Sequence, residues 1–94
     1  MTTIAELEHL VTRINVAAGT PTEQYTRTDD GRCKANPGNY HLSSAYGGHQ
    51  LCQMVNDGGG ARNITSGYVS KRELYYQMRA FLEGMLSIKN EGGI

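Results

Sequence analysis

The glycine-rich middle of the chain constrains its architecture more than any other feature. A Tyr-Gly-Gly step at 46–48 and a Gly-Gly-Gly step at 58–60 enclose a short apolar stretch, Leu51 to Val55. Glycine adopts the positive φ angles that tight turns require, so each step predicts a turn or a bulge beside a strand. The apolar stretch between them is therefore predicted to be a strand.

Alternation of side chains predicts two further strands. From Asn39 the pattern has a period of two, which places Tyr40, Leu42, Ser44 and Tyr46 on one face of a strand. A third short strand is expected at Ala61 to Thr65. Residues 40–65 thus predict a three-stranded antiparallel sheet, whose other face carries His41, Ser43 or Gln53 and is either wet or covered by a partner.

Helices are predicted on both sides of this sheet segment. Thr3 with Glu6, and Ser70 with Glu73, match the capping box that opens a helix. Each is followed by apolar residues at steps of three and four, as on the buried face of an amphipathic helix. The apolar positions are Ile4, Leu7, Leu10, Val11, Ile14 and Ala17 in the first helix, and Leu74, Tyr75, Met78, Phe81, Leu82, Met85 and Leu86 in the second.

The remaining residues are predicted to lack regular structure. Gly19 and Pro21 end the first helix, and the stretch that follows has few large apolar side chains. We expect a helix at 1–19, mostly loop at 20–39, a helix at 70–89 and a flexible tail at 90–94. An Asp-Gly pair at 30–31 also suits the turn of a short hairpin.

The expected fold is a single α+β domain of 94 residues. It consists of the amino-terminal helix, the three-stranded antiparallel sheet, and the carboxy-terminal amphipathic helix packed on one sheet face. A chain this short has a small core, and self-association would help it, so a homodimer is an open alternative.

The net charge and the lack of targeting signals narrow the expected cellular location and the kinds of partner. Nine basic and nine acidic side chains balance, so no overall field draws the chain to nucleic acid or to an anionic membrane. Met1-Thr2-Thr3-Ile4 does not resemble the start of a signal peptide, and no stretch is long enough to span a bilayer. These features predict a cytoplasmic protein that does not act at a membrane, with Cys33 and Cys52 as free thiols.

The second half of the chain resembles a group of small proteins encoded by bacteriophages and prophages. The similarity lies in the Tyr-Gly-Gly step at 46–48, the apolar strand, the glycine triplet, Ile64, and Lys71-Arg72-Glu73-Leu74 at the start of a helix. The resemblance implies an accessory protein that is made in the host cell during phage infection or is carried in a prophage. It assigns no functional residue.

The sequence does not favour catalysis or a metal site. Cys33, His41, His49 and Cys52 are the soft ligand types apart from His9, but only His49 and Cys52 are close in sequence, and an odd offset along a strand directs them to opposite faces. Cys52 lies among apolar residues, where a thiol behaves as a small hydrophobe. We therefore predict a protein that is not an enzyme and that has no cofactor.

Basic residues near glycines form one candidate binding site. Glycine-rich backbone and the first turn of a helix both expose N–H groups that bind anions. Basic residues in a first helical turn oppose the helix macrodipole, which suggests an acidic partner nearby. The candidate residues for a small anionic ligand or nucleic acid are Gly59, Gly60, Arg62, Lys71 and Arg72. The alternative is a simple hairpin turn and an ordinary helix cap.

Tyrosines form the second candidate. The chain has six tyrosines, one phenylalanine and no tryptophan, and tyrosine is enriched at protein interfaces. The candidate interface residues are Tyr40, Tyr46, Tyr68, Tyr76 and Arg79, with packing at the edge of the core as the alternative. The leading hypothesis is a phage accessory protein that binds a host component and inhibits a defence system such as CRISPR-Cas or nucleotide signalling. The rival hypothesis is a module that binds nucleic acid or nucleotides.

Overall fold

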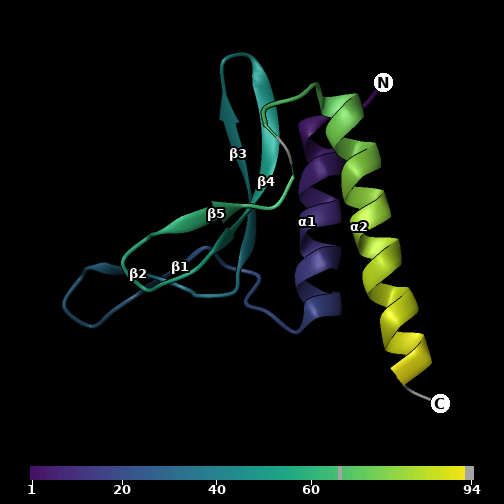
Figure 1. The fold of residues 1–94 in the computed structure, drawn as a ribbon. Helices are drawn as coiled ribbons and strands as arrows, with labels where there is room; N and C mark the ends of the chain where they lie inside the picture. Colours follow the sequence, from purple (N-terminus) through teal and green to yellow (C-terminus); the bar gives the residue numbers. More distant parts are fainter. Residues whose placement is uncertain (66, 93–94) are drawn as a thin grey trace.

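The computed structural model describes residues 1–65 and 67–92, which form two helices and two antiparallel sheets (Figure 1). The larger sheet has the strand order β3-β4-β5, which confirms the predicted α+β class and the three-stranded antiparallel sheet. In chain order the elements are α1 (Ile4–Ala18), β1 (Tyr25–Arg27), β2 (Cys33–Ala35), β3 (Tyr40–Ala45), β4 (Gly48–Met54), β5 (Ala61–Asn63) and α2 (Lys71–Gly92).

The second sheet is a two-stranded hairpin, β1-β2, inside the segment that we expected to be mostly loop. Its turn is at the Asp-Gly pair, where Gly31 has a φ of 83° and donates a hydrogen bond of 3.0 Å to the carbonyl of Thr28. Of the two interpretations of this segment, the short hairpin is correct. Both strands are short and mostly exposed, so they lack the apolar alternation that marks a strand in sequence.

Thr3 and Ser70 cap the two helices as predicted, each through the hydroxyl half of its capping box. The backbone N–H of Glu6 donates to Thr3 Oγ1 at 3.2 Å, and that of Glu73 donates to Ser70 Oγ at 3.2 Å. At the other end of α1, Gly19 takes a left-handed φ of 71° and closes the helix. Helix α2 extends to Gly92, so residues 90–92 belong to the helix and not to a tail. Residues 93 and 94 of the expected tail lie outside the described residues.

The two helices lie side by side and run in the same direction, with the sheets on one side of them (Figure 1). Helix α2 packs chiefly against α1 and touches β4, while α1 contacts β3. The expected packing of the last helix on the sheet is therefore only part of its contacts. No helix in the described part of the chain combines the length and hydropathy that a bilayer span requires.

The core lies between the helices and the inner face of the sheet. Leu7, Ile14, Leu51, Leu74 and Met78 have no exposed surface. The ring of Tyr40 packs edge-on against Phe81 with centroids 5.6 Å apart. The buried cluster as a whole comprises Leu7, Leu10, Val11, Ile14, Ala17, Tyr40, Leu51, Leu74, Met78 and Leu82.

The register of β3 against β4 determines which side chains lie on each face of the sheet. Leu42 pairs with Leu51 on the inner face, so the neighbouring pairs Ser43 with Gln50 and His41 with Cys52 lie on the outer face. Gln53 pairs with Tyr40, so it belongs to the inner face and not to the outer face that we expected.

Candidate functional site

The outer sheet face brings together a thiol and an imidazole, the pair that a cysteine nucleophile would need. His41 and Cys52 are directly opposite in the antiparallel register. Burial raises the pKa of the Cys52 thiol, and a hydrogen bond with Ser43 counteracts this only in part. Burial likewise lowers the pKa of His41, which a backbone hydrogen bond at Asn39 partly offsets. Both shifts favour the neutral forms, whereas an activated cysteine needs a lowered pKa.

The four soft ligand residues do not gather around one point. His49 Nδ1 is 2.7 Å from Ser44 Oγ near the hairpin turn, and Cys33 lies on β2 in the smaller sheet. Among the described residues, no three His, Cys, Asp or Glu side chains are grouped so that they could hold a metal ion. The described residues therefore hold no cluster of these side chains that could form a zinc shell, and the thiol of Cys52 is not activated.

The glycine triplet forms a turn in which two of the three amides are already bonded to a side chain. Asn56 Oδ1 accepts hydrogen bonds from the N–H groups of Gly58 at 3.0 Å and Gly60 at 2.9 Å. Gly59 has a φ of 97°, and the N–H of Val55 closes the turn on the carbonyl of Gly60 at 2.8 Å. The Asn56 carboxamide thus occupies the position that a bound anion would take.

The five residues of the predicted anion site do not converge. Arg62 on β5 donates two hydrogen bonds to Gln53 Oε1, at 3.0 and 2.7 Å. Lys71 and Arg72 open α2, which begins at the opposite side of the molecule from the turn before β5 (Figure 1). The candidate residues are thus divided between the turn and strand with Gly59, Gly60 and Arg62, and the start of α2 with Lys71 and Arg72.

The tip of the β3-β4 hairpin has an unusual aromatic residue. Ala45 pairs with Gly48, so Tyr46 and Gly47 alone make the turn, with φ angles of 54° and 75°. Positive φ at both positions is the mirror-image turn that hairpins prefer, and it usually contains asparagine or glycine. Tyr46 is the only residue other than glycine with positive φ in the described chain, and it is 96% exposed.

A second tyrosine supports the first at this tip. The rings of Tyr46 and Tyr68 pack edge-on with centroids 5.8 Å apart, and the Tyr68 hydroxyl is 3.3 Å from Ser43 Oγ. The backbone before α2 is held against β4 by two hydrogen bonds between His49 and Val69, of 2.8 and 3.0 Å. We call Tyr46, Tyr68 and Ser43 the hairpin-tip patch.

A separate patch lies on the exposed side of α2. The guanidinium of Arg72 is 6.0 Å from the centre of the Tyr76 ring, and that of Arg79 is 5.8 Å from the centre of the Tyr75 ring. Arg79 also donates to the Tyr75 hydroxyl at 3.2 Å, which raises the pKa of Arg79, and it pairs with Glu83 at 3.4 Å. We call Arg72, Tyr75, Tyr76 and Arg79 the helix patch.

The predicted interface residues are thus divided among three places. Tyr46 and Tyr68 form the hairpin-tip patch, and Tyr76 and Arg79 belong to the helix patch. Tyr40 is 8% exposed and lies in the core instead of at an interface. Its polar tip does not bring it to the surface, because its ring fills the space beside Phe81.

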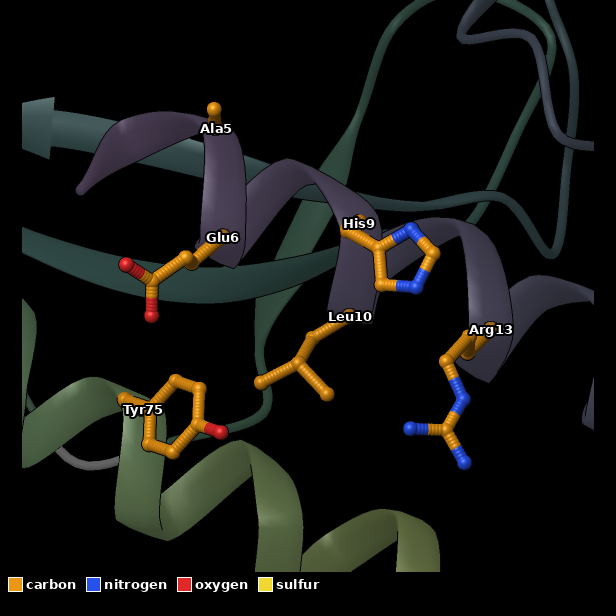
Figure 2. A pocket seen from close by; sticks show the side chains of 6 residues that line it. All are labelled: Ala5, Glu6, His9, Leu10, Arg13 and Tyr75. Atoms are coloured by element: carbon orange, nitrogen blue, oxygen red, sulfur yellow. The ribbon is translucent and has the colours of Figure 1, made fainter. Parts of the chain in front are cut away.

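Sequence reasoning did not identify a groove between α1 and α2. A hollow of about 300 Å³ is lined by Ala5, Glu6, His9, Leu10 and Arg13 from α1 and by Tyr75 from α2. Figure 2 shows Glu6 and Arg13 reaching from α1 toward α2 on either side of Leu10, with the Tyr75 ring facing them. The signal in the sequence that could have indicated this groove is a pair of opposite charges, seven residues apart, on the exposed edge of the first helix.

Comparison with known proteins gives no further guide to function. The chain matches no protein-family model, and it shows no significant similarity to a curated protein or to a solved structure. The functional argument therefore depends on the two patches and the groove.

Proposed function

We propose that the protein is a non-enzymatic accessory protein of a bacteriophage or prophage that binds a host component and thereby inhibits a bacterial defence system. The phage setting is supported by the resemblance of the Tyr-Gly-Gly, Gly-Gly-Gly and Lys-Arg-Glu-Leu segments to small phage proteins. CRISPR-Cas and nucleotide-signal defences are the candidate targets. The neutral forms that burial favours for Cys52 and His41 support binding over catalysis.

The observation that carries the proposal is Tyr46. A left-handed backbone costs about 1–2 kcal/mol for a residue with a side chain, and asparagine or glycine would avoid most of that cost. The ring gains little burial in return, since the residue is 96% exposed. The backbone conformation of Tyr46 therefore works against stability, and the burial of its ring offsets little of that cost. An exposed, rigid aromatic side chain is well suited to anchor a protein interface, and recognition explains why tyrosine occupies this turn.

Affinity capture with a turn-compatible variant tests the proposal. Tyr46→Asn keeps a residue that the turn accepts, so we expect thermal stability equal to or greater than that of the wild type. Wild-type protein immobilised in bacterial lysate should retain a specific protein, identified by mass spectrometry. Tyr46→Asn should retain about tenfold less of it, as expected for the loss of an interface anchor.

A matched control tests whether the loss of binding is specific to the tyrosine at the hairpin tip or follows the removal of any exposed tyrosine. Tyr25 on β1 is 49% exposed, and Tyr25→Thr removes an exposed tyrosine from the other hairpin while keeping a residue that favours strands. This variant should capture the partner as well as the wild type does. Equal capture by Tyr46→Asn and the wild type would contradict the proposed role of the tip.

A second candidate function, binding of nucleic acid or nucleotides, is favoured by the helix patch. Arg72 stacks over Tyr76, next to Lys71 at the start of α2. Stacked aromatic and basic side chains bind single-stranded nucleic acid, with an affinity that falls steeply as salt rises. Titration of a labelled oligonucleotide at low and high salt should then give a steep salt response, which Arg72→Gln reduces and Tyr46→Asn does not. A flat response would eliminate this alternative.

A further inference from the structure

Two charged side chains that line the groove have no ion-pair partner in the described part of the chain. Glu6 and Arg13 both line the hollow between α1 and α2, yet neither belongs to an ion pair within the described residues. Those ion pairs are Arg32 with Asp30, Lys34 with Asp57, and Arg79 with Glu83. Seven residues separate Glu6 from Arg13 on α1, which corresponds to about 10 Å along the helix axis. The two groups therefore cannot neutralise each other directly.

This arrangement is self-complementary. If a second copy of the groove approaches with its α1 antiparallel, Glu6 of each copy meets Arg13 of the other. One two-fold axis near Leu10 then generates two equivalent ion pairs, which is the hallmark of an isologous contact. We propose that the groove between α1 and α2 is a homodimer interface, in which the α1 helices of two copies lie antiparallel and exchange these two ion pairs.

Apolar surface extends the same contact. Beyond Arg13 the groove continues into a hollow of about 270 Å³ lined by Thr12, Val16, Ala17, Leu82 and Leu86. Val16 is 66% exposed and Leu86 is 38% exposed. In the antiparallel arrangement this hollow faces the segment around Ala5 of the second copy, whose small side chain allows the backbones to approach closely. The second copy would thus remove the exposed apolar surface of Val16 and Leu86 from water.

The direction of the helices also favours this occupant. Within one chain α1 and α2 run parallel, so the positive ends of both helix dipoles lie at the same end of the molecule (Figure 1). An antiparallel α1 from a second copy places the negative end of a helix beside them. The chain has a formal net charge of zero, so two copies do not repel each other overall.

The proposal is independent of the proposed binding function and adds to it. The hairpin tip lies at the same end of the molecule as the start of both helices (Figure 1). Antiparallel docking therefore directs the two hairpin-tip patches of the dimer away from each other. The dimer has one recognition surface at each end and can bind two copies of a target.

Charge reversal and mixing provide the test. Arg13→Glu places two carboxylates against each other at each ion pair, and Glu6→Lys places two cations there. Because symmetry doubles each change, either variant alone should raise the dimer dissociation constant by about tenfold or more in sedimentation equilibrium. An equimolar mixture of the two variants restores both ion pairs and should form a heterodimer, and the double variant should again form a homodimer.

Controls are needed for the folding of each variant and for disulfide bonds that could form between two copies. Glu6→Lys removes an acidic residue from the first turn of α1, so thermal unfolding of each variant is recorded alone and in the mixture. Glu23→Lys and Arg27→Glu make the same charge changes at exposed positions outside the helices and should dimerise like the wild type. A reductant is present throughout because Cys33 is exposed.

Three results would overturn the proposal. The first is a wild-type protein that remains monomeric at high micromolar concentration. The second is a dimer that Arg13→Glu does not weaken, which would locate self-association on another surface. The third is a mixture of the two folded single variants that associates no better than either variant alone.

Discussion

Asn15 is the residue that joins the helical layer to the sheet. It is fully buried in α1, where its Nδ2 donates to the carbonyl of Tyr40 at 3.0 Å and its Oδ1 accepts from the Tyr40 N–H at 2.8 Å. The hydroxyl of Thr20 donates to the same oxygen at 2.7 Å. An amide on an apolar helix face looks like an exception in the sequence, because its partner is the backbone of a strand that is distant along the chain.

Asn15→Ala should therefore be strongly destabilising. The substitution leaves both backbone groups of Tyr40 without partners in a buried site, and we expect a loss of about 2–3 kcal/mol in the free energy of unfolding. Urea denaturation measures this. Thr12→Ala, at an exposed position of the same helix, should change stability by no more than about 0.5 kcal/mol. Equal stabilities for the two variants would show that the amide does not clamp the layers.

Gly48 allows the chain before α2 to lie against β4. A Cβ added at this position would be 2.9 Å from both the carbonyl carbon and the Cβ of Tyr68, and 3.1 Å from the backbone nitrogen of Val69. Gly48→Ala must displace that backbone, and we expect a loss of about 1–3 kcal/mol in unfolding experiments. Gly58→Ala is the control, because its nearest neighbour is an Asn56 side-chain oxygen at 3.4 Å. If both variants unfold at the same denaturant concentration, the contact with Tyr68 is not tight.

At the scale of secondary-structure elements, the sequence predicted correctly those features that depend on residues close together in the chain. Thr3 and Ser70 cap the two helices through contacts with residues three positions away, and such short-range patterns are visible in the sequence. The alternation around Leu42 and Leu51 marked β3 and β4 because one face of each strand is buried. Strands β1 and β2 lack that contrast, so only their Asp-Gly turn signalled them.

The candidate site was less predictable than the elements. The turn at Tyr46 was expected from its glycines, but the left-handed φ of the tyrosine itself is a property of the two-residue register between Ala45 and Gly48. Tyr75 and Arg13 line the groove because α1 and α2 lie side by side, which no local pattern specifies. The use of the Gly58 and Gly60 amides by Asn56 likewise depends on the geometry of the turn.

Gly84 lowers the stability of helix α2. Gly84 is exposed in the helix, and nothing lies within 4 Å of the position that a Cβ would occupy. Gly84→Ala should stabilise the protein by about 0.5–1 kcal/mol, because alanine loses less backbone entropy in a helix. Thermal unfolding followed by circular dichroism measures the gain. Ala80→Gly, one turn earlier on the same helix, should cause a loss of similar size. A decrease in stability for Gly84→Ala would imply that the position is in contact with another chain.

At the scale of the whole molecule, the free energy of unfolding depends on pH, because folding partly buries the imidazole of His41. Its pKa lies below the ordinary value of 6.5, mainly because burial disfavours the charged form. The unfolded chain therefore takes up a proton before the folded chain does. The stabilising contribution of neutral His41 is complete above pH 6.5 and is lost as the pH falls below that value.

Urea midpoints between about pH 7.5 and about pH 5.5 test this coupling. The wild type should become less stable across this range, and His41→Gln, which cannot titrate, should lose less. Cys52, the titratable side chain opposite His41, stays neutral here because its pKa is raised from 9.0. An identical pH dependence for the variant and the wild type would show that the pKa of His41 does not change on folding.

The bridge between His49 and Val69 gives the hairpin tip a mechanical connection to the helices. Its two backbone hydrogen bonds lie one residue before Ser70, which caps α2. The hairpin tip and the first turn of α2 are therefore joined by a short path of backbone hydrogen bonds, although a loop and a strand separate them in sequence. The relative position of the hairpin-tip patch and of the helix that carries Arg72 and Tyr76 is thus fixed through backbone contacts and does not depend on the side chains of either patch.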